Sequence, residues 1–441
     1  MNREIFRLAI PNILSNLTVP LLGMVDTALM GRQESEAYIG AVALGSVILS
    51  FIYWSFGFLR MGTTGLTAQA FGRGNQSEQM QLLGQALLVG VGSGLLILLL
   101  QWPLIELSFW IMPGEPEVLA LAKEYVFIRI LAAPATIGLY AFSGWFLGMQ
   151  NARFPMWLVI CSNAINISLN LYFVQSLGMD VDGVAWATVI AQYAGFLLAI
   201  GLFWLRYRNM LAYLQRAILF DWVALKQFFS VNADIFLRTL CLIFVFAFFT
   251  AQSSAMDPLV LAANQILLQY FTTMSFAVDG FAFAAESLVG RFVGAKDEVQ
   301  LRKAVRLLFI WGIGFGCVFA GVYAIWGEPL LYVFTDQQTV IDQAKVFLPW
   351  VIVFPLAGAV AFMWDGTYIG ATAVRPMRNT LLLATFGVFL PVYFLTIDSL
   401  GNHGLWLAMT LFMVARSVSL TVLAPRHIVI TKNPPEPGGS N

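Results

Sequence analysis

The segment Gly90-Val-Gly-Ser-Gly94 returns 222 positions later as Gly312-Ile-Gly-Phe-Gly316. More small and charged residues keep this register, and the pairs are Gly72 and Gly294, Glu106 and Glu328, Gly144 and Gly366, Gly148 and Gly370, and Arg153 and Arg375. The repeated unit is about half of the chain, far longer than the roughly 20–50 residues of a solenoid repeat. The chain therefore reads as one duplicated domain.

The composition predicts that both halves lie in a membrane. Hydrophobic residues make up 59% of the chain and charged residues 11%, and the mean hydropathy is +0.78. A soluble domain carries about 25% charged residues. The formal net charge is zero, so nothing indicates a nucleic-acid partner. Cys161, Cys241 and Cys317 lie in apolar segments, which is typical of small core residues rather than of disulfides or metal ligands.

Apolar windows of about 20 residues predict twelve transmembrane helices. Their approximate ranges are 6–31, 41–70, 82–103, 119–149, 154–176, 183–206, 226–253, 258–290, 304–326, 340–370, 377–397 and 403–424. Six helices fall in each repeat, and an even number means that both halves enter the membrane from the same side. We therefore predict an all-α integral membrane protein with two six-helix lobes, related by a pseudo-two-fold axis along the membrane normal.

The predicted lobes are residues 1–205, with helices one to six, and residues 227–426, with helices seven to twelve. Residues 206–226 form a predicted cytoplasmic linker, and residues 427–441 a disordered cytoplasmic tail rich in proline and glycine. Seventeen Lys and Arg residues fall on one side of this topology and three on the other. The excess of positive charge on the cytoplasmic side then predicts that both termini are cytoplasmic.

Several ionisable residues fall inside the predicted spans. Four are basic, and these are Arg60, Arg129, Arg238 and Arg416. An ionisable group near the bilayer centre costs at least about 2.5–3.5 kcal/mol, so each needs a partner, a water-filled cavity or a function. Asp234 lies four residues before Arg238, which predicts an ion pair on one helix face, either structural or involved in gating.

The second half carries further embedded carboxylates. Asp279 and Glu286 lie seven residues apart and share one stripe of a predicted helix. Asp365 opens the segment Asp365-Gly-Thr-Tyr-Ile-Gly370, and its repeat partner in the first half is Ser143. The two halves therefore share a scaffold but not a polar chemistry.

The first half contains the main candidate site. Asp26 lies about 20 residues, or roughly 30 Å, from the cytoplasmic start of helix one, which predicts a position in the outer half of the membrane. Asn163, Asn166 and Asn170 share one face of helix five, and Thr188 of helix six reaches a similar depth. A carboxylate among amide and hydroxyl oxygens suits a proton or a sodium ion. The alternative is that the three asparagines only join helices.

Five stretches resemble one family, and these are Val19-Pro-Leu-Leu-Gly-Met-Val-Asp-Thr-Ala-Leu-Met-Gly31, Leu59-Arg-Met-Gly-Thr-Thr-Gly-Leu-Thr-Ala-Gln-Ala-Phe-Gly72, Asp279-Gly-Phe-Ala-Phe-Ala284, Asp365-Gly-Thr-Tyr-Ile-Gly-Ala371 and Asn402-His-Gly-Leu-Trp-Leu-Ala408. The chain is similar to the multidrug and toxic compound extrusion (MATE) family, in particular its DinF (DNA-damage-inducible protein F) branch. The resemblance implies two six-helix lobes around a central cleft. It also implies export of organic compounds coupled to inward flow of protons or sodium ions, at the inner membrane of a bacterium.

The resemblance also implies roles for individual residues. The family's coupling carboxylate corresponds to Asp26, the asparagine of its fifth-helix motif to Asn166, and its sixth-helix threonine to Thr188. Many relatives carry a second aspartate at the position of Asn170, so this sequence favours protons over sodium ions. Apart from the resemblance, Pro20 lies six residues before Asp26 and removes a backbone donor, which suggests the hypothesis that helix one bends there when Asp26 changes its protonation state. The alternative is that proline is simply common in membrane helices.

We therefore predict a secondary active multidrug efflux transporter that exports apolar or cationic compounds by cation antiport and alternating access. We expect small organic substrates and membrane lipid as partners, a monomeric state, and no cofactor or bound metal. An enzyme is disfavoured because His403 and His427 are the only histidines and show no metal-ligand spacing. A flippase for a lipid-linked intermediate is the alternative, but it would need a basic cavity, whereas the embedded charges are mainly acidic.

Overall fold

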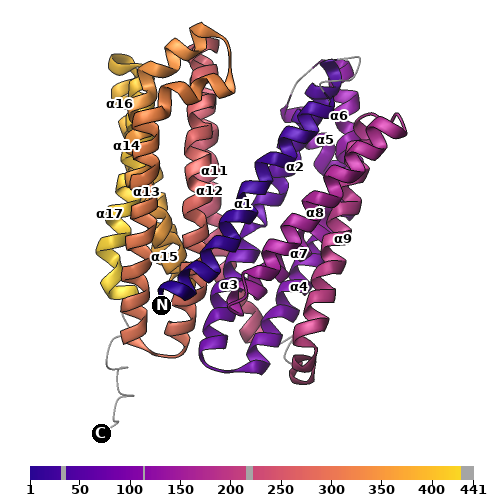
Figure 1. Cartoon of the computed structure of the whole chain (residues 1–441), viewed down its shortest axis with the longest axis vertical. Helices are drawn as coiled ribbons and strands as arrows, with labels where there is room; N and C mark the ends of the chain where they lie inside the picture. Colours follow the sequence, from indigo (N-terminus) through magenta and orange to yellow (C-terminus); the bar gives the residue numbers. More distant parts are fainter. Residues whose placement is uncertain (31–35, 113–114, 215–221, 429–441) are drawn as a thin grey trace. The chain divides into compact units, whose positions relative to one another are not determined.

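The computed structural model describes residues 1–30, 36–112, 115–214 and 222–428, without the side chains of residues 19–30, 36, 222–225 and 227. All regular elements of this part are helices (Figure 1). In chain order, the first helices are α1 Asn2–Met30, α2 Glu36–Ser55, α3 Gly57–Gly72, α4 Gln76–Leu99, α5 Gln101–Ile111, α6 Pro116–Arg129, η1 Ile130–Ala132, α7 Ala133–Gly148, α8 Arg153–Leu171, η2 Tyr172–Ser176, α9 Val181–Tyr207 and η3 Arg208–Tyr213. They are followed by α11 Trp222–Met256, α12 Pro258–Gly294, α13 Glu298–Phe334, α14 Gln338–Gly370, α15 Val374–Leu382, η4 Leu383–Phe389, α16 Leu390–Leu400 and α17 Asn402–His427.

The helices match the predicted spans. Among the described residues, eleven helical segments are long and apolar enough to cross a membrane. α1, with 29 residues, corresponds to the first predicted span, although its side chains from residue 19 onward lie outside the description. Lipid offers no hydrogen-bond partner, so a spanning segment must pair its own backbone groups, and a helix does this. The predicted all-α membrane class is confirmed.

Prolines interrupt two of the predicted spans. The span predicted at 119–149 consists of α6 and α7, joined by the 3-10 turn η1. Pro134 has no backbone N–H, and its ring crowds the carbonyl group of Ile130 four residues earlier, which accounts for the altered turn. The span predicted at 377–397 contains the π-helical segment η4, and Pro391 has the same relation to Gly387 within it.

Two other spans are divided into separate helices or followed by one. The span predicted at 41–70 is interrupted at Phe56, between α2 and α3. The span predicted at 82–103 ends at Leu99, and a separate helix, α5, follows it. Pro103 lies in the first turn of α5, where its missing N–H would have no partner within the helix. These breaks leave the number and order of the spans unchanged.

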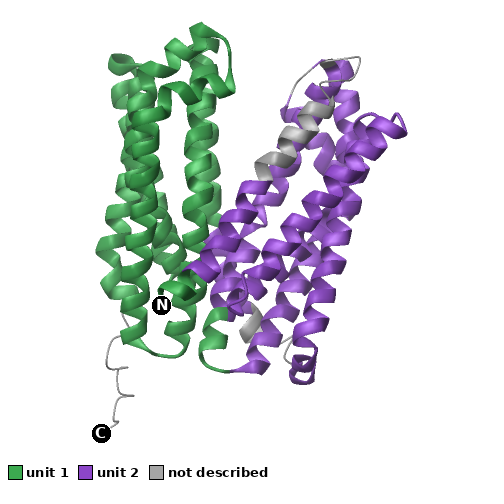
Figure 2. Ribbon diagram, in the orientation of Figure 1, with its two compact units in different colours: residues 1–5, 68–74, 237–441 green, residues 6–67, 75–236 purple. Residues whose placement is uncertain are grey.

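The chain forms two compact units (Figure 2). Unit 1 comprises residues 1–5, 68–74 and 237–441, and unit 2 comprises residues 6–67 and 75–236. The change from one unit to the other in the second half occurs inside α11, after Phe236. The lobe boundaries expected from the sequence, at residues 205 and 227, stay predictions.

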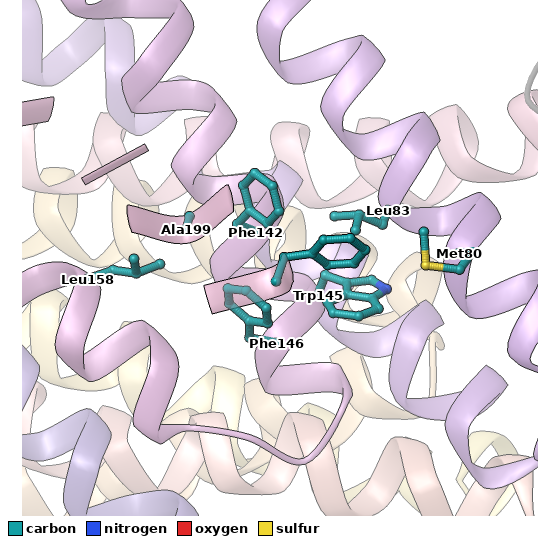
Figure 3. Packing of buried hydrophobic residues seen from close by; sticks show 8 residues of the cluster. Met80, Leu83, Phe142, Trp145, Phe146, Leu158 and Ala199 are labelled. Carbon is teal, nitrogen blue, oxygen red and sulfur yellow. The ribbon is translucent and has the colours of Figure 1, made fainter. Parts of the chain in front are cut away.

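Unit 2 contains a buried aromatic cluster where α4, α7, α8 and α9 meet (Figure 3). Its members are Met80, Leu83, Phe142, Trp145, Phe146, Leu158, Ala199 and Phe203. The indole N–H of Trp145 donates a hydrogen bond of 2.7 Å to the carbonyl oxygen of Gln79. Since helices in lipid associate through close packing rather than through removal from water, this cluster fixes how α7 lies against its neighbours.

Glycines at equivalent positions bring helix backbones together in each unit. In unit 2, a methyl group at Gly144 of α7 would overlap the carbonyl oxygen of Arg60 in α3. In unit 1, a methyl group at Gly366 of α14 would overlap the carbonyl oxygen of Ala282 in α12. Residues 60 and 282 are 222 positions apart, as are 144 and 366. The sequence repeat is therefore also a repeat of helix contacts.

A second glycine pair lies within unit 1, where residues 68–74 pack against the end of α12. A methyl group at Gly72 would overlap the carbonyl oxygen of Arg291, and one at Gly294 would overlap that of Gln69. Gly294 lies 222 positions after Gly72, and Arg291 lies 222 positions after Gln69, so the two repeats contribute equivalent residues to this contact. This local contact is thus two-fold symmetric in sequence and in geometry.

The Gly144 contact can be tested by adding one methyl group. We expect Gly144→Ala to lower the apparent melting temperature in detergent, because overfilling a tight contact costs about 1–3 kcal/mol. Gly92→Ala is the matched control, since a methyl group at Gly92 of α4 would meet no atom within 4 Å. Equal melting temperatures for the two variants would contradict a close contact at Gly144.

Candidate functional site

A chain of buried hydrogen bonds joins α8 and α9 in unit 2. The side-chain amide of Asn170 donates to Oδ1 of Asn166 at 2.9 Å, and the amide of Asn166 donates to Oγ1 of Thr188 at 2.9 Å. The Thr188 hydroxyl in turn donates to the carbonyl oxygen of Val184 at 3.0 Å. All three polar side chains are at most 3% exposed. The structure therefore brings together three of the residues that the sequence singled out.

The fourth of these residues, Asn163, links α8 to α1. Its amide donates to Oγ1 of Thr18 at 3.1 Å and to the carbonyl oxygen of Thr18 at 3.4 Å. Asn163, Asn166 and Asn170 lie on one face of α8, because offsets of three and four residues are about one helical turn. One polar stripe of α8 thus serves two neighbouring helices.

α1 and α8 run in the same direction within unit 2. The hydroxyl of Tyr38, eight residues beyond the end of α1, donates to Asp180 at 3.3 Å, and Asp180 lies nine residues beyond the end of α8. The helices therefore finish at the same end of the unit, and they also contact each other earlier, at Thr18 and Asn163. The backbone of α1 is helical through residue 26, whereas the side chains of Asp26 and Pro20 lie outside the described residues.

α8 changes its winding just after Asn170. Residues Tyr172–Ser176 form the π-helical segment η2, which directly continues α8. In a π-helical segment the backbone hydrogen bonds join residues five apart rather than four apart, and such segments occur often at functional sites. η2 could not be predicted from the residues within it, because they include no proline or glycine.

A cluster of buried charges lies in unit 1, and it joins three helices. Oδ2 of Asp365 in α14 accepts hydrogen bonds from Arg238 of α11 and from Arg416 of α17, the latter at 2.7 Å. All three residues are at most 5% exposed. The Nε atoms of both arginines have no hydrogen-bond partner among the described residues. Two guanidinium groups therefore share one carboxylate oxygen.

Other candidates occupy the surroundings of this cluster or lie apart from it. Asp279 of α12 is half-buried and acts electrostatically on Arg416, and Glu286, on the same helix, is buried. Asp234 is buried on α11, and Arg60 of α3 is half-buried in unit 2. The ion pair expected between Asp234 and Arg238 stays a prediction.

The sequence did not reveal how these charges are connected. Asp365 and its two partners are 127 and 51 residues apart, so no helical spacing could predict their contact. Thr18 was also missed as the partner of Asn163, although its position eight residues before Asp26 places both on α1. Arg129, another embedded cation, donates to the hydroxyl of Tyr125 at 2.5 Å.

These features define a class of protein: a multi-pass α-helical membrane protein with two related halves and buried polar groups in each. The sequence profile of the MatE family matches residues 11–172 and 235–395. The chain belongs to the MatE family, as its motifs indicated.

Individual relatives agree with this membership. The chain is 38% identical over 428 residues to the DNA damage-inducible protein F of Escherichia coli (strain K12), covering 97% of this chain and 92% of that protein. It is 23% identical over 430 residues to the probable multidrug resistance protein NorM of Thermotoga maritima, covering 95% and 90% of the two chains.

A solved structure shares the fold. The outward-facing conformation of a multidrug resistance MATE family transporter of the MOP superfamily matches with a TM-score of 0.87 at 17% identity, covering 96% of this chain and 95% of that one. The match shows the fold, and membership of the MatE family makes the chain a membrane transporter that is homologous to multidrug efflux transporters.

The buried charge cluster should be essential for stability. We expect Asp365→Asn to lower the melting temperature strongly, because removing one member of a buried ion pair costs about 3–5 kcal/mol. Asp342→Asn is a matched control on the same helix, since Asp342 is exposed and its pair with Lys345 is 3.5 Å long. Thermal unfolding in detergent measures both, and equal melting temperatures would contradict a structural role for Asp365.

Proposed function

We propose that this transporter exports organic compounds, apolar or cationic, in exchange for protons by alternating access, with Asp26 as the coupling carboxylate. A relative and a solved neighbour carry multidrug resistance in their names. The observation that carries the proposal is the buried chain of hydrogen bonds from Asn170 through Asn166 to Thr188. The same face of α8 contacts α1 through Asn163 and Thr18, so this chain of hydrogen bonds lies on the face that α8 turns toward α1.

Helix geometry supports the role of Asp26. α1 and α8 run in the same direction and touch at Thr18 and Asn163. Asp26 lies eight residues beyond Thr18, and Asn170 lies seven residues beyond Asn163, which is roughly 12 and 10.5 Å at 1.5 Å per residue. We therefore expect residues 26 and 170 at the same depth.

Two considerations favour protons over sodium ions. An ionised carboxylate only accepts hydrogen bonds, whereas a protonated one also donates, and side-chain amides can serve as partners to either form. A hard cation needs several oxygen ligands at once. The side-chain oxygens of Asn166 and Thr188 already accept hydrogen bonds, and Asn170 supplies an amide in place of a second carboxylate.

Asp365 of unit 1 is a weaker candidate for coupling than Asp26. A coupling group must exchange its ligand in every cycle, whereas Oδ2 of Asp365 is already bound by two guanidinium groups. We assign to Asp365 the joining of α11, α14 and α17. In unit 2, protonation of Asp26 would change its hydrogen bonds to α8 and α9, and Pro20 would allow α1 to bend in response.

The central test is Asp26→Asn, which keeps the size of the side chain but removes the titratable proton. In proteoliposomes with an imposed pH gradient and no sodium, the unaltered chain should export a fluorescent organic cation. We expect Asp26→Asn to fold and to bind the compound, but to lose at least about 90% of the gradient-driven transport, as for loss of an essential acid–base group.

Asp342→Asn serves as the control for that experiment, since it changes an exposed aspartate of α14 in the same way. Normal pH-driven transport by a well-folded Asp26→Asn would refute the coupling role. Transport by the unaltered chain that requires sodium and ignores pH would refute the choice of ion. Asn170→Asp should increase the response to sodium if position 170 belongs to the ion site.

We further propose that the chain lies in the inner membrane of a bacterium with both termini in the cytoplasm, from the distribution of its positive charges. In a background without Cys161, Cys241 and Cys317, a membrane-impermeant thiol reagent should label Glu115→Cys from outside intact cells. Arg216→Cys should be labelled only after the membrane is opened. Labelling of position 216 in intact cells would reverse the proposed orientation.

A further inference from the structure

A groove of about 380 Å³ runs between α13, α14 and α17 of unit 1. Its lining is mainly apolar and includes Val305, Trp364, Thr421 and Pro425, with Arg302 and Arg306 among its charged residues. The indole N–H of Trp364 donates a hydrogen bond of 2.7 Å to the hydroxyl of Thr421. The ring of Trp364 also packs against that of Phe309, with 4.6 Å between the ring centroids. The base of the groove is therefore held in place by contacts between helices.

One edge of the groove is basic. Arg302 and Arg306 are exposed and lie one turn apart on α13. Arg302 forms an exposed ion pair of 3.4 Å with Glu298, and Arg306 forms no ion pair within the described part of the chain. The edge thus carries two positive charges and one negative charge.

The same stripe of α13 becomes apolar further along the helix. Ile310, one turn beyond Arg306, is 53% exposed. Val418 and Val422 of α17 are also exposed, at 56% and 68%. Apolar side chains exposed in this way on membrane helices face lipid chains. The groove therefore opens where charged and lipid-covered surfaces meet.

The corresponding place in unit 2 is filled. The positions equivalent to Arg302, Val305, Trp364, Thr421 and Pro425 are Met80, Leu83, Phe142, Ala199 and Phe203, all members of the aromatic cluster (Figure 3). The repeated scaffold can thus close this space with side chains of the right size. In unit 1 the space is open and has two arginines at its edge, whereas the described side chains at the equivalent positions of unit 2 form a packed cluster.

We propose that the groove binds one anionic phospholipid, with its phosphate at Arg302 and Arg306 and an acyl chain along Val305 and Trp364. Guanidinium groups bind phosphate oxygens in pairs of parallel hydrogen bonds, and basic pockets between membrane helices are suited to anionic lipid headgroups. The lipid belongs to the cytoplasmic leaflet if the proposed orientation holds. The chain's own residues 429–441 are a poorer match, because their only acidic side chain is that of Glu436.

The test compares lipid binding by full-length variants in native mass spectrometry. Protein in a neutral detergent is titrated with phosphatidylglycerol or phosphatidylcholine. The unaltered chain should retain one phosphatidylglycerol in preference to phosphatidylcholine. In R302Q/R306Q the ratio of the affinities for phosphatidylglycerol and phosphatidylcholine should fall roughly tenfold to thirtyfold. Each basic residue near an anionic lipid raises the affinity about fivefold, and the variant removes two.

The double variant R375Q/R378Q is the matched control, because it removes two basic residues of α15 outside the groove. It should keep the preference for phosphatidylglycerol. Unchanged binding by R302Q/R306Q, or an equal loss in both double variants, would overturn the proposal. Removal of residues 429–441 should also leave binding unchanged, and a several-fold increase would identify the tail as the occupant instead.

Discussion

Close approach of helix backbones at glycine is the constraint on which both halves depend. Lipid gives helices no hydrophobic drive to associate, so close packing must hold them together. Gly144 and Gly366 let a neighbouring carbonyl group come within the space of a missing methyl group, and Gly72 and Gly294 do the same inside unit 1. These positions repeat because a larger residue at any of them would separate the helices that carry the polar groups.

The spans could be predicted from sequence because the bilayer determines both their length and their apolar composition. Interruptions were harder to predict. Pro134 and Pro391 produce local 3-10 and π-helical turns, but a proline within a span leaves its hydropathy almost unchanged. The extra helix α5 was missed because its apolar residues continue those of α4. Average hydrophobicity therefore carries no information on local backbone geometry.

The polar network of unit 2 was predictable in part, and for a definite reason. Spacings of three and four residues put Asn163, Asn166 and Asn170 on one face of α8, so one helix face could be recognised by itself. The partners of Asp365 could not be found in this way, because they come from helices far apart in the sequence. An embedded charge predicts that a partner exists, but only the fold decides which one.

The two halves show how one scaffold can serve different chemistry. Backbone contacts at glycines fix the helices, whereas side chains between these contacts can change without moving them. Ser143 thus corresponds to Asp365, and Met80 in a filled cluster corresponds to Arg302 at an open groove. Unit 2 buries neutral amides, which can exchange hydrogen bonds at little electrostatic cost. The charges that unit 1 buries at Arg238, Asp365 and Arg416 are paired, and their separation is costly, so they are suited to holding helices together rather than to changing partners in each transport cycle.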